Sequence, residues 1–493
     1  MTAVQDALEL GQKGDSMNAK QQTTRCSRRT VLKGLGLAGV GALASPLILP
    51  SGVWGAGAAS PNNKLNVAAI GTGGRCCALI QEVLSNGDNI VALCDVDQTQ
   101  LERAAKLVAD KAGQGAKKPN CYEDYRKLLE TEKSLDAVLV ATGSRWHAPL
   151  CVAFMKAGKH VYCEKPLVRR IAEARELIEL VPKCKVATQH GTQGGSSKAF
   201  RRSIEVIQAG LLGQIRLVHM WCDGYGRFPP SRDRPAGEDP VPFGLNWDFW
   251  LGPVPFRPFK RGVYHPGCLA FQNWFDLCNG MLAGQGAHTF NLPVRALKLD
   301  HPTRVEAEVL EPVKETYVSR GSFRFDIAAR GDLAPVTVWW MDGEKYPPEE
   351  VTQGVTAISG KLPKFGCLFV GEKGELFAGG WGENGIMKLK GDKGWRGVLD
   401  HEAAKPVPVT LPRAPSDNHM LEWLQACQGG PATFTPFDVA AQAAAVYLPG
   451  NVSLRLGRPI DWDGVAMKAR GVPEADPLIQ KMYRTKWLLD GRA

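Results

Sequence analysis

A glycine-rich turn beginning at residue 71 has the composition of a phosphate-binding loop. The apolar run LNVAAIG (65–71) leads into GTGGR (71–75), and ALIQEVLSNGDN (78–89) follows at helical spacing. Gly71 and Gly73 allow a tight turn and let backbone amides approach a pyrophosphate, which the N-terminus of the next helix attracts. We therefore expect a dinucleotide to contact Gly71, Thr72, Gly73, Gly74 and Arg75.

A carboxylate stands at the end of the next apolar run. IVALCD ends at Asp95, 24 positions after Gly71. In dinucleotide-binding folds an acid at this place hydrogen-bonds the ribose 2′-hydroxyl. Because this acid would repel a 2′-phosphate, NAD is favoured over NADP. Cys76 takes the place of a third small residue in the fingerprint, and it is small enough for helix–strand packing. An ordinary strand-to-helix turn is the alternative, but the neighbouring strands and helix favour nucleotide binding.

Strand and helix patterns alternate through the first third of the chain. Apolar runs at 135–142, 160–163 and 185–191 are separated by helical patterns, which predicts a parallel, doubly wound sheet. Ligands bind such sheets at the carboxyl ends of the strands. There we expect Gly71–Gly74, Asp95, Thr142–His147 and Glu164–Pro166. From residue 215 to 391 strand patterns dominate, and helical patterns at 417–428 and 438–457 follow.

Composition excludes several classes of function. The chain has 493 residues and a formal net charge of +10, yet its basic residues form no run of the kind that marks nucleic-acid binding. Its 13 cysteines include no CxxC pair and no zinc spacing. We therefore expect neither a nucleic-acid partner nor a metal site, and most of the cysteines are interpreted as small buried residues.

Residues 1–58 have the pattern of a twin-arginine signal peptide. Ser27-Arg28-Arg29-Thr30 precedes a Gly/Ala/Leu-rich apolar stretch, and small residues at 56–58 follow it. The stretch is interrupted by Gly and Pro, so it makes a poor spanning helix, and an N-terminal anchor or a basic arm is the alternative. The leader predicts export of the folded protein by the twin-arginine machinery, to the periplasm or beyond, with no stable membrane insertion after cleavage.

A collection of motifs across 64–493 resembles one known family. They include GTGGR, YEDYRKLL, DAVLVAT with WHAP, AGKHVYCEKPL, NWDFWLGPVP and GMLAGQGAHTFN. These resemble the glucose–fructose oxidoreductase/inositol dehydrogenase/MocA (Gfo/Idh/MocA) family, in its exported bacterial branch. The resemblance implies an α/β fold: an N-terminal Rossmann domain, then an α/β domain on a large, mostly antiparallel sheet. An open face of that sheet commonly forms the oligomer interface, so a homodimer or homotetramer is expected.

The resemblance also implies which residues carry the chemistry. It places Lys165, of the Glu-Lys-Pro motif, beside the nicotinamide and the substrate hydroxyl, and it implies a cis bond before Pro166. His288 matches the second catalytic position, with a structural histidine as the alternative. The expected cofactor contacts, beyond the glycine loop and Asp95, are Thr142, His147, Glu164, Lys165 and Gln193. We expect domains at 64–190 (NAD-binding) and 191–465 (substrate and oligomerisation), with 466–493 as a tail packing back on the body.

The chain departs from the family pattern in three places. Gly284 stands where the family has an Asp four residues before the histidine, so the usual substrate-binding or catalytic carboxylate is absent. Gly195 replaces an Arg, and Gly143-Ser144-Arg145 replaces Pro-Asp-His. These changes leave open a protein of the same fold that binds a carbohydrate without catalysis.

Residues 221–275 are rich in aromatic side chains, whose faces match the C–H faces of sugar rings. Half or more of them are expected in the core, with Trp247, Phe249 and Trp250 as the leading set. The expected substrate contacts are Tyr225, Arg227, Tyr264, Asn273 and His288; Arg232, Asp233 and His265 are further polar candidates.

The reading that joins these observations is an exported NAD-dependent oxidoreductase acting on a sugar or glycoside. Free NAD is scarce outside the cytoplasm, so we expect tightly bound cofactor that is regenerated in place by coupled oxidation and reduction of two sugars. The alternative is a redox-neutral glycosidase or epimerase that oxidises C3 and reduces it again.

Overall fold

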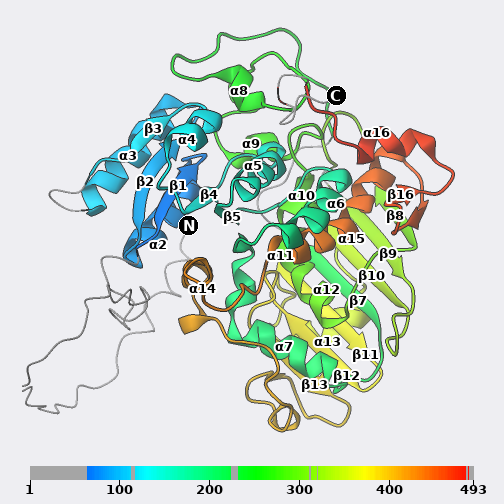
Figure 1. The fold of residues 1–493 in the computed structure, drawn as a ribbon. Coiled ribbons are helices and arrows are strands. Elements are labelled where there is room, and N and C mark those ends of the chain that lie inside the picture. Colours follow the sequence, from blue (N-terminus) through cyan, green and yellow to red (C-terminus); the bar gives the residue numbers. More distant parts are fainter. Residues whose placement is uncertain are drawn as a thin grey trace, which may run out of the picture. The chain divides into compact units, whose positions relative to one another are not determined.

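The computed structural model describes residues 64–112, 117–223, 231–309, 312–318, 320–484 and 487. The expected signal peptide (1–58) and the substrate candidates Tyr225 and Arg227 lie outside the described residues. The described chain is built on two sheets. Figure 1 shows the strands of the first in blue to teal and those of the second in green to orange.

The first sheet has six parallel strands in the order β3-β2-β1-β4-β5-β6. They are β1 (Asn66–Ile70), β2 (Asn89–Cys94), β3 (Asn120–Tyr122), β4 (Ala137–Val140), β5 (His160–Cys163) and β6 (Thr188–His190). From β1 the chain adds β2 and β3 on one side, and it then returns to add β4, β5 and β6 on the other side. The carboxyl ends of β1 and β4 therefore flank the crevice where such folds bind nucleotides. The predicted doubly wound parallel sheet is confirmed.

Helices cover both faces of this sheet. They are α2 (Gly74–Ser85), α3 (Gln98–Ala112), α4 (Tyr125–Thr131), α5 (Ser144–Lys156) and α6 (Ile171–Leu180). α2 buries Cys76, Leu79, Ile80 and Val83, the spacing that places one helical face on a sheet. The last four residues of β1 are all buried, as expected of a central strand that is covered on both sides.

The second sheet has ten strands in the order β14-β13-β12-β11-β7-β10-β9-β8-β15-β16. Only β7 and β10 pair in parallel, so the predicted mostly antiparallel sheet is confirmed. The strands are β7 (Ile215–Cys222), β8 (Arg304–Val309), β9 (Gly321–Ile327), β10 (Val336–Asp342), β11 (Phe365–Gly371), β12 (Gly374–Ala378), β13 (Ile386–Leu389), β14 (Arg396–Gly397), β15 (Ile460–Asp463) and β16 (Lys468–Ala469).

The remaining helices of the described residues come after β6 in the chain. They are α7 (Lys198–Gln208), α8 (Trp247–Leu251), α9 (Cys268–Gln272), α10 (Gly280–Gly284), α11 (Gly286–Thr289), α12 (Asn291–Ala296), α13 (Glu349–Ser359), α14 (His419–Cys427), α15 (Phe437–Leu456) and α16 (Asp476–Ile479). None of the helices in the described segments is long and apolar enough to cross a bilayer.

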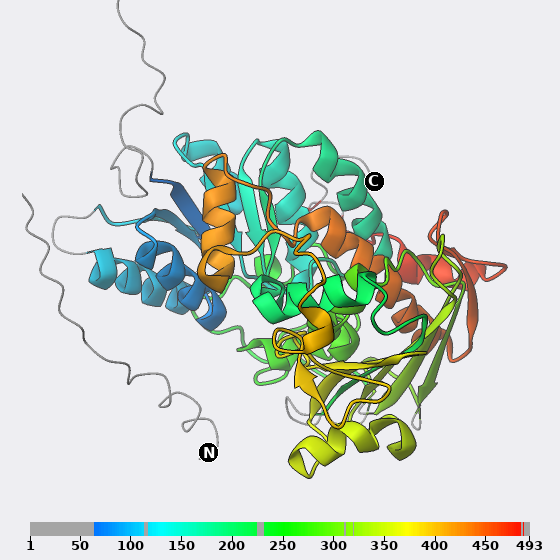
Figure 2. The ribbon, with the colours of Figure 1, turned by 90° about the horizontal axis from the view of Figure 1, so that it is seen from below.

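Alternation along β10 explains how the two faces are filled. Trp340 faces Phe290 and the core beneath α15, whereas Trp339 joins a separate cluster with Trp221 and Val355 of α13. Figure 2 shows α15 and α13 on opposite sides of this sheet. α13 therefore covers part of the face opposite α15.

The last described residues pack against the first domain. The Tyr483 hydroxyl donates to Glu173 Oε1 (2.6 Å), and Arg484 Nη1 lies 2.7 Å from Asp248 Oδ1. The Trp487 ring packs edge-on against Trp146 of α5, with ring centroids 5.1 Å apart. The C-terminal segment thus reaches the helices beside the crevice of the first sheet.

A buried carboxylate on α7 joins that helix to the loop before α14. Glu205 is 1% exposed and accepts hydrogen bonds from Arg202, from Arg413 and from the backbone of Leu411. Burial alone would raise the pKa of this carboxylate. The hydrogen bonds and the arginine charges outweigh that effect and lower the pKa of Glu205 to about 2.

Glu205→Gln should destabilise the fold, because it leaves Arg202 and Arg413 facing a neutral amide. We expect the free energy of unfolding at pH 7 to fall by about 3 kcal/mol, measured by urea titration. The folded pKa lies below the ordinary 4.5, so the stabilisation is complete above about pH 4.5 and is lost as the pH falls towards 2. The difference in unfolding free energy between wild type and variant should therefore become smaller as the pH falls over that interval. The exposed control Glu130→Gln should change little, and a gap unchanged at pH 2 would contradict the assignment.

Candidate functional site

The glycine loop between β1 and α2 is shaped for close approach of a ligand. Gly71 has φ +80°, and a Cβ there would lie 2.7 Å from Thr142 Cγ2, so only glycine fits. A Cβ on Gly73 or Gly74 would meet no atom within 4 Å. No side chain caps the N-terminus of α2. Its free amides and positive dipole end therefore suit a phosphate group.

Asp95, at the end of β2, supports this loop and also lines the space beside it. Its Oδ2 accepts the Thr72 amide (2.6 Å) and the Thr72 hydroxyl (3.0 Å), and its Oδ1 accepts the Asp97 amide. Burial raises the pKa of Asp95 while these bonds oppose the rise. Thr72 is fully buried and does not line the cavity; its role is to hold Asp95 against the loop.

A cavity of about 570 Å³ lies along the carboxyl ends of β1, β2 and β4. This is within the usual size range of cofactor sites, roughly 300–1,000 Å³. From the first domain its walls include Gly71, Gly73, Gly74, Arg75, Asp95, Asp97, Glu123, Asp124, Tyr125, Thr142, Gly143 and Arg145. Residues far along the chain complete them: Phe249, Trp250, His265–Cys268, Phe271 and Trp487. The open cradle, the free helix end and Asp95 together fit NAD.

We call residues 244–272 the cap, because this segment is bound to the first domain beside the cavity. The Asn246 amide donates to Val96 O, and the Gln98 amide donates to Gly244 O, both at 2.9 Å. His265 Nε2 lies 3.1 Å from Asp97 Oδ2. The cap thus adds a wall to the cofactor cavity. Sequence reasoning missed this role, although it singled out the aromatic content of the segment.

Arg145 joins α5 to the cap. Its guanidinium lies 3.7 Å from the Trp250 ring centre, and its Nε and Nη2 donate to Trp250 O. Burial lowers the pKa of Arg145 to about 9. Arg145 Nη1 is buried without a partner, in a residue that lines the cavity. The departure from the family pattern at this position therefore serves to hold the cap.

Lys165 follows β5, and its amine is anchored on another element. Nζ donates to the carbonyl of Gly284, at the end of α10, at 2.7 Å. The preceding Glu164 accepts Arg75 Nε (2.7 Å) and Gln193 Nε2 (3.2 Å). The Lys165–Pro166 bond is cis. Arg75, Glu164, Lys165 and Gln193 thus form one connected set beside the glycine loop.

Two buried histidines, His190 and His288, lie near enough to Lys165 for its charge to lower their pKa values. His288 Nδ1 and His190 Nε2 have no hydrogen-bond partner. The His288 ring stacks on Trp381, with centroids 4.9 Å apart. Burial, and after it the charge of Lys165, lower the pKa of His288 well below its usual range. His288 is therefore neutral at pH 7, and its Nδ1 is buried without a partner.

His147 is one of five predicted cofactor residues that do not line the cavity, the others being Thr72, Glu164, Lys165 and Gln193. It is 1% exposed. Its Nδ1 lies 2.7 Å from Pro166 O and its Nε2 3.0 Å from Thr142 O. It positions the ends of β4 and β5.

Gln272 fills the space at Gly284, where the family pattern has a carboxylate. A Cβ on Gly284 would overlap the Gln272 side-chain amide. Gln272 belongs to α9, at the end of the cap. The loss of the carboxylate is therefore matched by a polar side chain from another element.

Two predicted substrate residues are buried away from the cavity. Tyr264 is 1% exposed and packs between Trp247 and Trp274. Asn273 is 3% exposed, and its Nδ2 donates to Tyr317 O at 3.4 Å. Neither lines the cavity, whereas His265 does.

Gly284→Asp should destabilise the fold on its own, because the new side chain meets the buried amide of Gln272. We expect a loss of about 2–4 kcal/mol in the free energy of unfolding, measured by urea titration. In a protein that already carries Gln272→Ala, the Gly284→Asp substitution should cost no more than half as much unfolding free energy as it does in wild type. Strictly additive effects would show that Gln272 does not occupy the place of the carboxylate.

Comparison with known proteins agrees with this geometry. Residues 65–192 match the model of the Gfo/Idh/MocA "Oxidoreductase family, NAD-binding Rossmann fold". A glycosyl hydrolase family 109 protein of Stenotrophomonas maltophilia is 31% identical over 188 residues, 36% of this chain and 38% of that protein. A myo-inositol 2-dehydrogenase of Thermotoga maritima is 31% identical over 159 residues, 32% of this chain and 44% of that protein. The chain thus spans less than half the length of these curated relatives.

Solved structures extend the likeness to the whole fold. A WlbA dehydrogenase from Bordetella pertussis, in complex with NADH and UDP-GlcNAcA, has a TM-score of 0.53 at 15% identity, covering 81% of this chain and 99% of that one. An inositol dehydrogenase homologue from Azotobacter vinelandii, with NADH and myo-inositol, has a TM-score of 0.55 at 17% identity, covering 81% and 98%. At these identities the likeness establishes the fold alone. Residues 65–192 thus match the NAD-binding Rossmann domain of the Gfo/Idh/MocA oxidoreductase family.

Proposed function

We propose that the protein is an NAD-dependent oxidoreductase that acts on a hydroxyl of a sugar or glycoside and keeps its cofactor between turnovers. The observation that carries this proposal is the cavity of about 570 Å³ that joins the glycine loop and Asp95 to Thr142 at the end of β4. Lys165 stands at the end of β5, the strand next to β4. The acidic groups of Asp95, Asp97 and Glu123 on its walls disfavour a 2′-phosphate and favour NAD over NADP.

The residues around Lys165 are suited to moving a proton on a substrate hydroxyl. NAD, when bound, supplies the hydride acceptor and donor. The Gly284 carbonyl fixes the Lys165 amine, which leaves its other N–H bonds to hold the hydroxyl oxygen. Neutral His288, with Nδ1 free, accepts the hydroxyl proton on oxidation and returns it on reduction. No side chain from position 284 takes part.

Retention of the cofactor follows from the cap and from the leader-like N-terminus. The cap and Trp487 add walls that the first domain alone does not have. We include in the proposal that the protein is exported in folded form and carries its NAD. In this scheme a second sugar would take up the hydride in place.

A redox-neutral glycosidase is the second candidate, supported by the relatives of the glycosyl hydrolase family 109. Oxidation of one hydroxyl acidifies the neighbouring C–H, and elimination then releases the leaving group and forms a double bond. Water adds to that double bond, and the carbonyl is reduced again. This scheme needs one substrate and incorporates solvent deuterium at the acidified carbon. Coupled oxidation and reduction needs two substrates and leaves that carbon unlabelled. Turnover in D₂O with one or two sugars separates the candidates.

Protein purified without added cofactor should release about one NAD(H) per chain on denaturation. Gly73→Asp gives the sharpest contrast, because a side chain there has open space and Asp is a favourable N-cap for α2. The variant should fold at least as stably as wild type yet carry no NAD, since its charge repels the pyrophosphate. Lys165→Met should retain NAD and lose turnover. Wild-type protein that is empty and fails to bind added NAD would reject the enzyme and favour a binding protein of the same fold.

His288→Gln should lower kcat by about 10²–10³-fold with little change in bound NAD. Because the folded pKa of His288 is lowered, the neutral base persists at mildly acidic pH. The acid limb of the kcat/KM profile should therefore lie below the ordinary pKa of histidine, 6.5. An acid limb at or above that value would assign the titration to another group.

A further inference from the structure

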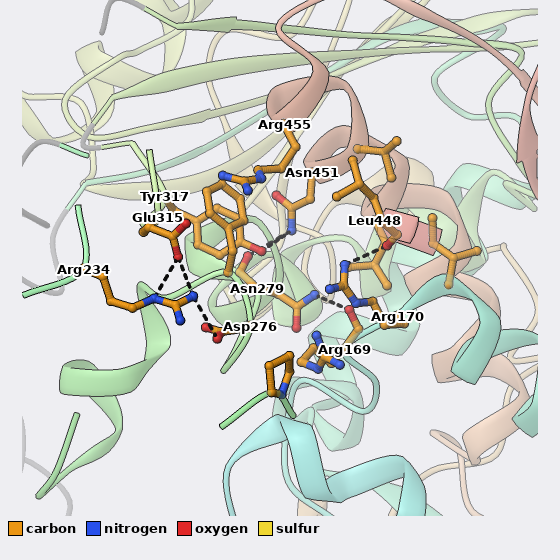
Figure 3. Close-up of a pocket in the computed structure, with 15 residues that line it drawn as sticks. Arg169, Arg170, Arg234, Asp276, Asn279, Glu315, Tyr317, Leu448, Asn451 and Arg455 are labelled. Atoms are coloured by element: carbon orange, nitrogen blue, oxygen red, sulfur yellow. Dashed lines mark hydrogen bonds and ion pairs between the residues drawn. The ribbon is translucent and has the colours of Figure 1, made fainter. Parts of the chain in front are cut away.

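A second cavity, of about 190 Å³, lies between the connection from β5 to α6, helix α10 and helix α15. None of its wall residues lines the cofactor cavity, and neither Lys165 nor His288 borders it. Figure 3 shows its polar side chains, with Arg169, Asn279 and Asn451 among them. A cavity of about 150 Å³ holds a benzene-sized molecule, so this one has room for a six-carbon compound.

Arg169 is the most unusual group on its wall. The residue is 3% exposed, and Nε, Nη1 and Nη2 are all buried without a hydrogen-bond partner. The comparably buried Arg201 directs its nitrogens at Gly195 O, Pro412 O and Glu422 Oε1. A buried guanidinium with no acceptor is costly. Arg169 therefore calls for an acceptor from outside the chain.

Both acids on the wall face arginines, although Asp276 Oδ2 accepts no hydrogen bond. Asp276 forms ion pairs with Arg257 and Arg234, and Glu315 Oε2 lies 2.8 Å from Arg234 Nη2. Arg170 adds a second positive charge: its Nη1 donates to Leu478 O, and its Nε has no partner. The cavity wall thus has an excess of positive charge, and its ligand should be an anion.

Two side-chain amide oxygens on the wall indicate that the ligand also carries hydrogen-bond donors. Asn279 Nδ2 donates to Arg169 O (2.9 Å) and Asn451 Nδ2 donates to Asn279 O (3.1 Å). Because both acceptors are carbonyls, the two amide orientations are fixed. The remaining Oδ1 atoms are buried and unpartnered. They are acceptors only, so they match hydroxyl donors on a ligand.

We propose that this cavity is a binding site for a small polyhydroxylated carboxylate, of the aldonate or uronate class. Arg169 pairs with the carboxylate in the bidentate manner that guanidinium favours. Asn279 and Asn451 accept the hydroxyls. Arg455, whose guanidinium lies 4.2 Å from the Phe275 ring centre, borders the cavity from α15. The site goes beyond the proposed activity and does not depend on it.

The test is calorimetric titration of the holoprotein with D-gluconate, D-glucuronate, D-glucose and inorganic phosphate. One of the two sugar acids should bind, with glucose and phosphate at least ~10-fold weaker. Arg169→Met should weaken that binding at least ~10-fold and should fold stably, because it removes an unpaired buried charge. Arg455→Met, at an exposed position, should weaken it severalfold without a folding risk. Lys165→Met and the surface control Arg396→Met should leave it unchanged.

Three results would overturn the proposal. Equal binding of phosphate would make the site a simple anion site. Loss of binding in Lys165→Met, with Arg169→Met unaffected, would assign the sugar acid to the site beside Lys165. Absence of heat for both sugar acids would show that the cavity takes no ligand of this class.

Discussion

One imidazole ring holds together the two strand ends on which the site depends. His147 lies between the carbonyls of Thr142 and Pro166, which follow β4 and β5. Thr142 borders the cofactor cavity, and Pro166 follows the anchored lysine. Because burial lowers the pKa of His147, the neutral ring has one N–H to share between two carbonyls. Packing of α5 must therefore hold the ring as firmly as its hydrogen bonds do.

Local chemistry explains what the sequence could predict. The glycine loop and Asp95 are recognisable because a tight turn, a helix start and an acid at a strand end lie within about thirty residues of one another. Parallel strands bring their carboxyl ends to one edge, so Thr142 and Lys165 could be placed near the loop from their order alone. The sheet class followed from the same alternation, and the comparisons confirm it.

Contacts between distant segments explain what it could not predict. The cap has helices of only five residues, α8 and α9. Its role rests on backbone hydrogen bonds to Val96 and Gln98, which no hydrophobic periodicity of the sequence predicts. Tyr264 was a candidate for substrate contact because it lies on a Gly/Pro-rich loop, yet it is buried in a cluster with Trp247, Trp250 and Trp274. At Gly284 the sequence shows a missing carboxylate, and only the fold shows Gln272 in its place.

The walls of the cofactor cavity draw on Gly71, near the first described residue, and on Trp487, the last. Such a wall is complete only when the end of the chain has docked on α5. The affinity of this cavity for its cofactor would therefore report whether the C-terminal segment is docked, because Trp487 contributes to the wall.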